Sequence, residues 1–70
     1  MHLQNFLTPR EKEIFDLLVN NKDTVYISNN LHISEKTVRN HISNVIQKLG
    51  VKGRSQAIIE LIKIGEISLD

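Results

Sequence analysis

The sequence predicts an all-α domain of four helices, and three features of the pattern lead to this fold class. Between residues 34 and 50, apolar residues recur at the spacing that places them on one face of a helix. Residues 8–11 carry side chains that typically start a helix, and glycines follow two of the predicted helices. Seventy residues suffice for one small domain, whose core is near the lower limit for independent folding.

The first predicted helix runs from Pro9 to about Asn20. Thr8 is suited to accept a hydrogen bond from the first free amides, and Glu11 stands where its carboxylate completes a capping box. Proline is favoured at the first helical position because its missing N–H would have no helical partner there. The residues that this helix is expected to bury are Ile14, Phe15, Leu17 and Leu18.

A second, short helix is expected from Asp23 or Thr24 to about Leu31. An aspartate at its start both caps the helix and complements the helix dipole. Residues 32–33 then form a tight corner, and two helices joined by so few residues must cross steeply, as in a helix-turn-helix. Ser28 is expected where the two backbones meet, since a larger side chain there would overpack the crossing.

The third predicted helix, about residues 35–49, is capped by Ser34 and ended by Gly50. Its apolar stripe consists of Val38, Ile42, Val45, Ile46 and Leu49. The other side carries amides, a hydroxyl and cations: Lys36, Arg39, Asn40, Ser43, Asn44, Gln47 and Lys48. A helix that needed only a hydrated surface would more often carry Glu and Lys there. Because these groups hydrogen-bond to base edges and phosphates, we expect the helix to lie in a DNA major groove.

The distribution of charge supports this interpretation, although the formal net charge is only +1. The segment between residues 36 and 54 contains no Asp or Glu, and its cations are Lys36, Arg39, Lys48, Lys52 and Arg54. A basic segment within a nearly neutral chain is typical of phosphate binding. On charge alone, a solvated charged surface is the alternative interpretation.

A fourth helix is expected from about Ser55 to Ile64, ended by Gly65. Its apolar residues cover more than one face: Ala57, Ile58, Ile59, Leu61, Ile62 and Ile64. An apolar surface larger than one core can cover indicates a second partner. We therefore predict a homodimer with an interface formed by Ile58, Ile59, Leu61 and Ile62. The alternative is that Ile67 and Leu69 fold back over the excess.

Several classes of function are excluded or disfavoured by what the sequence lacks. There is no cysteine, so disulfides and thiolate metal sites are excluded, and His2, His32 and His41 lack the spacing of metal ligands. There is no apolar run of membrane length and no signal peptide, which leaves the cytoplasm as the default location. Motifs for phosphate loops and nucleophiles are also missing. We expect a non-enzyme without cofactor, metal or small-molecule ligand.

Together, these motifs resemble the LuxR-type (LuxR/FixJ/GerE) helix-turn-helix family, and the likeness is greatest to a short stand-alone regulator of that family. The residues that carry it are Leu7-Thr8-Pro9-Arg10-Glu11, Ile33-Ser34, Thr37-Val38-Arg39, His41, Lys48-Leu49-Gly50-Val51, Arg54 and Ala57. The resemblance covers about Leu7 to Gly65. It implies a sequence-specific regulator of transcription that binds double-stranded DNA, with the third helix in the major groove and the fourth pairing two copies. RNA polymerase would be a further candidate partner.

The resemblance also implies roles for individual residues. Arg39, Asn40 and Ser43 fall where such domains contact bases, with Lys36 and Asn44 beside them. The expected contacts to the DNA backbone come from Thr24, Tyr26, Thr37, Gln47, Lys48, Lys52 and Arg54.

Some of these residues also have structural interpretations. Arg39 has an ion-pair partner in Glu35, one helical turn earlier, and Arg54 is equally suited to bracing the loop through carbonyls. Thr37 and Lys48 match positions that hold backbone or packing roles. The family commonly has Asn-Lys-Glu-Ile-Ala at the start of the second helix, where residues 24–28 are Thr-Val-Tyr-Ile-Ser. A phosphate contact there would have to come from the Tyr26 hydroxyl or from the free helix-start amides.

We predict the following domain boundaries. Residues 1–7 form an arm, of which Phe6 and Leu7 are placed to fold back on the core; residues 8–66 form the domain; and residues 67–70 form a tail. The helix-turn-helix lies at about residues 24–43. Two alternatives compete with a DNA-binding regulator. One is an interaction module that dimerises with a full-length regulator without binding DNA, and the other is a promoter-binding domain like region 4 of a sigma factor.

Overall fold

The computed structural model describes residues 6–69, and within this range it contains four α-helices and no strand. They are α1 (Pro9–Val19), α2 (Thr24–Leu31), α3 (Glu35–Leu49) and α4 (Arg54–Lys63). The all-α prediction is confirmed, and each predicted helix is present with bounds within about one residue. No helix in the described range is long and apolar enough to cross a membrane.

The first three helices begin at the side-chain caps that the sequence predicts. In α1 the Thr8 hydroxyl accepts from the Glu11 amide at 3.2 Å, and the Glu11 carboxylate accepts from the Thr8 amide at 3.0 Å, which completes the capping box. The Asp23 carboxylate accepts from the Tyr26 amide at 2.9 Å, and the Ser34 hydroxyl accepts from the Thr37 amide at 3.0 Å. Each cap contributes about 1 kcal/mol to stability.

The corner between α2 and α3 is formed by His32, which has a left-handed backbone with φ of +60°. The Ile33 amide donates to the Ser28 carbonyl at 3.1 Å, which closes the turn. Ser28 is buried, as predicted for the crossing, and its hydroxyl donates to the Val25 carbonyl at 2.9 Å. The small side chain therefore leaves no unpaired polar group at the place where α2 meets α3.

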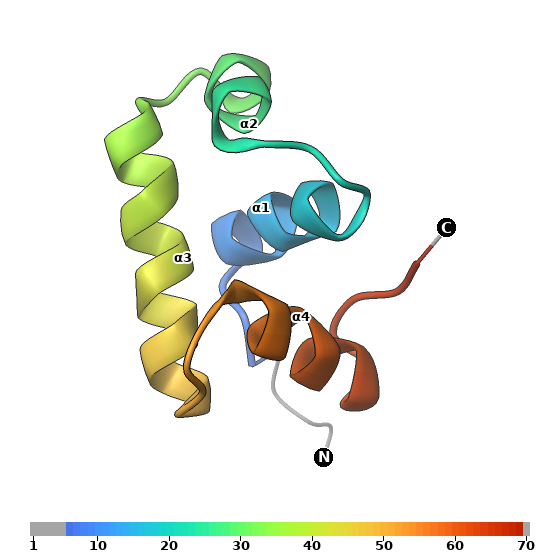
Figure 1. Ribbon diagram of the computed structural model, residues 1–70. Coiled ribbons are helices and arrows are strands. Elements are labelled where there is room, and N and C mark those ends of the chain that lie inside the picture. Colours follow the sequence, from blue (N-terminus) through green and yellow to red (C-terminus); the bar gives the residue numbers. More distant parts are fainter. Residues whose placement is uncertain (1–5, 70) are drawn as a thin grey trace.

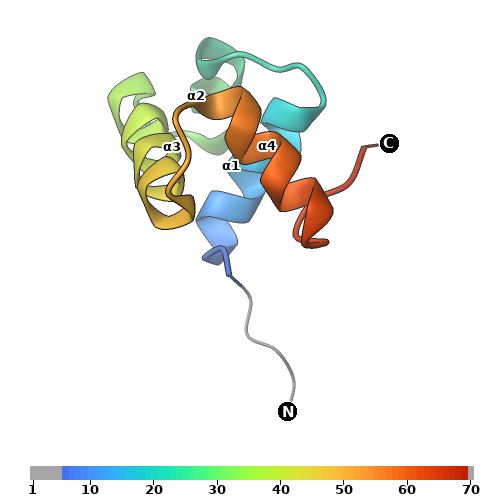
Figure 2. The ribbon, with the colours of Figure 1, turned by 60° about the horizontal axis from the view of Figure 1, so that its bottom comes forward.

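The helix α3 forms one edge of the molecule, and the other three helices all lie on the same side of it (Figures 1 and 2). This arrangement follows from its amphipathic sequence, because only the stripe that contains Val38, Ile42 and Val45 has to be removed from water. The opposite side of α3 therefore remains accessible along the length of the helix.

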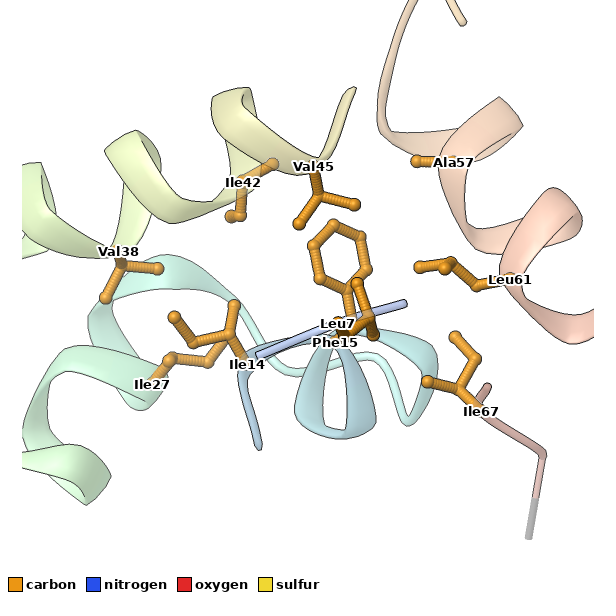
Figure 3. Packing of buried hydrophobic residues seen from close by; sticks show 10 residues of the cluster. All are labelled: Leu7, Ile14, Phe15, Ile27, Val38, Ile42, Val45, Ala57, Leu61 and Ile67. Carbon is orange, nitrogen blue, oxygen red and sulfur yellow. The ribbon is translucent and has the colours of Figure 1, made fainter. Parts of the chain in front are cut away.

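The core is one cluster in which α1 supplies the central residues (Figure 3). Phe15 lies beneath Val45 of α3 and beside Leu61 of α4, and both Phe15 and Ile14 are fully buried. Leu17 and Leu18 also pack against this cluster, as expected, but both are half-buried at its margin. Sequence analysis missed the burial of Glu11.

Both ends of the described chain belong to the folded domain. Leu7 and Ile67, which lie on either side of the predicted domain of residues 8–66, are core residues. The Glu66 carboxylate accepts from the amides of Phe6 and Leu7, at 3.0 and 3.3 Å. Phe6 and Leu7 return to the core, as predicted. Of the two residues in the alternative interpretation of the fourth helix, Ile67 also reaches the core, whereas Leu69 is exposed. The rest of the predicted arm, residues 1–5, lies outside the described residues.

The crossing at Ser28 can be tested with Ser28→Leu, which we expect to lower the free energy of unfolding by about 1–3 kcal/mol through overpacking. Urea denaturation followed by circular dichroism measures the change. Asn29→Leu is the matched control, since Asn29 is the exposed neighbour on the same helix. Equal stability of the two variants would contradict the close crossing.

Candidate nucleic-acid interface

The outer face of α3 is a continuous polar surface. Its exposed side chains are Lys36, Arg39, Asn40, Ser43, Asn44 and Gln47, which are the residues predicted for this face. They occupy three turns of one straight helix, so they are presented in a row rather than scattered over loops. A row of amides, a hydroxyl and cations on one helix has the dimensions and the hydrogen-bonding groups to fit a major groove.

Few contacts within the chain hold these groups in place. Within residues 6–69, the side chains of Asn40, Ser43 and Asn44 make no hydrogen bond. Arg39 does form the predicted pair with Glu35, at 3.5 Å, with both side chains about half exposed. Such a pair contributes only ~0.3–0.5 kcal/mol. The guanidinium can therefore exchange this carboxylate for a ligand at little cost.

The start of α2 presents an aromatic side chain and a cation side by side. Tyr26 is 44% exposed, and the Lys22 ammonium lies 5.0 Å from the centre of its ring, within the range of a cation–π contact. Thr24 is half-buried at the first position of the helix. The sequence had indicated no role for Lys22. Its position four residues before Tyr26 was the available signal for this pair.

Thr37 serves the start of α3. Its amide donates to the Ser34 hydroxyl, which in turn donates to the Thr37 hydroxyl at 2.9 Å. Thr37 is half-buried, so this reciprocal contact fixes its side chain close to the helix end. The hydroxyl retains a free lone pair towards solvent, which leaves a backbone contact open to it.

Lys48 is not the free cation that sequence analysis expected. Its ammonium lies 2.7 Å from a Glu11 carboxylate oxygen, donates to the Phe6 carbonyl at 3.1 Å, and sits 5.1 Å from the centre of the Phe6 ring. The Lys48 side chain is 35% exposed and that of Glu11 only 7%. Its charge is therefore already paired within the fold of the free protein. We favour a structural role for Lys48 over the DNA-backbone contact that the resemblance implies, which stays a prediction.

Glu11 is ionised at neutral pH in spite of its burial. Burial by itself raises the pKa of the Glu11 carboxyl, because it disfavours the charged form. The hydrogen bond and charge of Lys48, together with the amide and hydroxyl of Thr8, lower it by more. The net pKa lies below the ordinary value of 4.5. The pair between Glu11 and Lys48 is thus a true ion pair.

The loop after α3 contributes two exposed cations. Lys52 and Arg54 form no ion pair within residues 6–69. Arg54 is the first residue of α4 and makes no hydrogen bond to a carbonyl in the same range, so the bracing role considered for it is not observed. Both residues remain available for phosphates.

Part of the apolar surface of α4 is left uncovered. Ile59 and Ile64 are 55% and 51% exposed, and Ile58 and Ile62 are half-buried. Leu61, by contrast, is fully buried against Phe15, so its assignment to a dimer interface is wrong. Sequence analysis chose it because the apolar residues of α4 nearly encircle the helix. Periodicity alone did not show which of them face the chain's own core.

His41, one of the residues that carry the family resemblance, is half-buried at the margin of the apolar stripe of α3. No group of three or more His, Cys, Asp or Glu side chains suited to a metal ion occurs in the described part of the chain.

Comparisons with known proteins agree with this architecture. Residues 5–61 match the model of the family described as bacterial regulatory proteins, luxR family. The spore germination protein GerE of Bacillus subtilis (strain 168) is 65% identical over 63 residues, which cover 90% of this chain and 85% of that protein. A solved structure titled as the transcription factor GerE superposes with a TM-score of 0.93 at 67% identity, covering 96% of this chain and all of the other.

Longer relatives match over the same domain. The transcriptional regulatory protein DegU of Brevibacillus brevis is 43% identical over 93% of this chain, and DesR of Bacillus subtilis (strain 168) is 48% identical over 77% of it. The chain spans only 28% and 27% of those two proteins. It therefore corresponds to a single domain of each.

The chain belongs to the luxR family of bacterial regulatory proteins. It is a DNA-binding regulator of transcription with a helix-turn-helix. The resemblance inferred from the sequence motifs, including that to a short stand-alone regulator, is confirmed.

The pKa of Glu11 leads to a prediction about acid stability. Because the folded pKa lies below the ordinary value of 4.5, the unfolded chain binds this proton more readily. The contribution of Glu11 to stability is thus complete above about pH 4.5 and is lost as the pH falls further. Urea denaturation between neutral pH and about pH 3 should show that the free energy of unfolding falls more steeply for the native chain than for Glu11→Gln. Parallel falls in the two chains would contradict this role of Glu11.

Proposed function

We propose that this protein binds paired DNA half-sites as a homodimer, with α3 of each copy in the major groove. The observation that carries this proposal is the continuous exposed polar face of α3, opposite an apolar face whose residues Val38, Ile42 and Val45 are buried. The geometry can hold a rigid row of hydrogen-bonding groups against base edges. The proposed activity is binding alone, with no catalytic step.

Base recognition is assigned to the middle of α3. The Arg39 guanidinium can donate two hydrogen bonds to guanine, and the Asn40 amide can both donate to and accept from adenine. Ser43, one turn further, can bond either kind of edge. Lys36 and Asn44 flank this set on the same exposed face. The short reach of the amide and hydroxyl side chains requires the helix to approach the bases closely.

Contacts to the DNA backbone are assigned to the two ends of this face. At the start of α2 and α3 they come from Thr24, Tyr26 and Thr37, to which we add Lys22. At the far end they come from Gln47, Lys52 and Arg54. Each phosphate that a cation neutralises releases a counterion, so affinity should fall steeply as salt rises. These contacts hold the register of α3 and carry little sequence information.

Pairing of two copies is assigned to α4. Its uncovered residues Ile59 and Ile64, with Ile58 and Ile62 at their margin, offer an apolar surface that a second copy can cover. A symmetric pair would place two α3 helices in successive major grooves, about 10 base pairs apart. The cytoplasm is the expected location, and RNA polymerase bound nearby is a candidate partner.

The exposed face of α4 also favours a second candidate function. An interaction module would use this face to pair with a full-length regulator and would need no affinity for DNA. Titration of any duplex by mobility shift at two salt concentrations separates the two, because only the DNA-binding regulator gives salt-dependent binding.

Asn40→Ala tests base recognition on a site selected from a random pool of duplexes. We expect a loss of about 1–3 kcal/mol on the selected site and much less on random DNA, because the amide bonds base edges. Fluorescence anisotropy titrations of both duplexes measure the difference. Asn20→Ala is the control, since Asn20 is an exposed amide at the end of α1. Equal losses on both duplexes would rule out base recognition by Asn40.

Ile59→Glu tests pairing through α4. Placing a carboxylate in an apolar interface should remove the gain from burying isoleucine, about 1.5–3 kcal/mol for each copy. Sedimentation equilibrium should show a shift from dimer to monomer, and affinity for paired half-sites should fall while that for a single half-site is retained. Val25→Glu is the control for the sedimentation measurement alone, because Val25 is an exposed apolar residue on α2 but lies beside the proposed backbone contacts. An unchanged dimer in Ile59→Glu would exclude this face.

A further inference from the structure

We infer that Glu11 and Lys48 are positioning residues, whose ion pair sets the tilt of the recognition helix and so the placement of its base-contacting side chains. The inference rests on the proposed function, because it concerns the approach of α3 to the bases. Neither residue is assigned a contact with DNA. Their effect on binding is transmitted through the orientation of α3.

The pair joins the start of α1 to the end of α3. Glu11 lies in the first turn of α1, and Lys48 is the penultimate residue of α3. The carboxylate is fixed on its other side by the Thr8 amide, and the ammonium also donates to the Phe6 carbonyl. Phe6 is in turn held by Glu66. Lys48 is therefore anchored to Glu11 of α1 and to Phe6, and through Phe6 to Glu66, rather than to one flexible partner.

Among the described residues, the directional side-chain contacts at this end of α3 are those of Lys48, with the Glu11 carboxylate and the Phe6 carbonyl. The neighbouring residues Ile46 and Leu49 are half-buried and contribute apolar packing, which does not depend on orientation. A charge-assisted hydrogen bond of 2.7 Å, by contrast, requires a defined approach of donor and acceptor. The ion pair is thus the contact that favours one tilt of α3 over other tilts that differ from it by a few degrees.

A small change of tilt would matter at the bases. Arg39 lies nine residues before Lys48, which is about 13 Å along the helix axis. A rotation of about 5° at Lys48 would move Arg39 by about 1 Å over that length. Hydrogen bonds to base edges weaken over displacements of this size. Specific binding would suffer, while longer and more adaptable contacts to phosphates would be retained.

The competing interpretation is that Lys48 leaves Glu11 and contacts a phosphate. That exchange would leave the Glu11 carboxylate buried without its counter-charge, which is strongly unfavourable. The two interpretations predict opposite results for Glu11→Gln. If Lys48 bound phosphate, neutralising Glu11 would release it and tighten DNA binding. If the pair positions α3, the same substitution weakens specific binding.

Glu11→Gln and Lys48→Met, alone and combined, test the inference in the full chain. Glutamine can still accept from the Thr8 amide, so the capping box is retained and only the charge is lost. Methionine keeps the apolar stem of lysine. Lys48→Arg keeps a cation that can pair with Glu11, and Lys52→Met is the comparison variant, since it removes a cation that is proposed to contact phosphate. Circular dichroism first confirms that each variant is folded at the assay temperature. Anisotropy titrations on the selected site and on random DNA are then carried out over a series of salt concentrations.

We expect each single variant to lose about two- to thirtyfold in the ratio of specific to random binding. The double variant should lose no more than the worse single variant, and Lys48→Arg should retain most of the ratio. The salt slope should stay as in the native chain, whereas Lys52→Met should reduce it by about 0.9. Specific binding by the native chain tests the proposed function separately from these variants.

Three results would overturn the inference. The first is a reduced salt slope for Lys48→Met with equal losses on both duplexes, and the second is tighter binding by Glu11→Gln. The third is a lower melting temperature in both variants with an unchanged binding ratio, which would make the pair a purely structural contact. Should folding be incomplete in Lys48→Met, the comparison of Lys48→Arg with Glu11→Gln at lower temperature decides the same question.

Discussion

The burial of one face of α3 against Phe15 is the contact on which the rest of the structure depends. A domain of this size has room for one core, and α3, its longest helix, needs most of that core to cover a single side. α1 supplies the centre of the packing, α2 closes over one end, and α4 with Ile67 closes the other. What remains of α3 is its polar side, which no element of the described chain covers.

The polar surface of α3 is thus exposed because the small core covers only one side of the helix. The groups that we propose to contact DNA do not have to be assembled from several loops, because a rigid helix presents them once its apolar side is packed. The short contacts at the two ends of α3 have a different task. The Ser34 cap and the left-handed His32 hold its start close to α2, and the ion pair from Glu11 holds its end close to α1.

Much of this could be predicted from the sequence because the signals are local. Capping residues, apolar spacing and glycines define the four helices, and the polar face of α3 follows from its periodicity. The partner of Lys48 could not be predicted in this way, since Glu11 lies 37 residues earlier. The same limit applies to Leu61, whose burial depends on Phe15 in another helix, and to Ile67, which reaches the core only after the chain has turned at Gly65.

The contact between Glu66 and the amides of Phe6 and Leu7 has a consequence for protein architecture. It ties the first described residues to the segment that follows α4, so the two ends of the described chain are held together. The Phe6 carbonyl also accepts from Lys48 at the end of α3. A pull on residues 6–7 would therefore act at once on α3, through Lys48, and on the segment after α4, through Glu66.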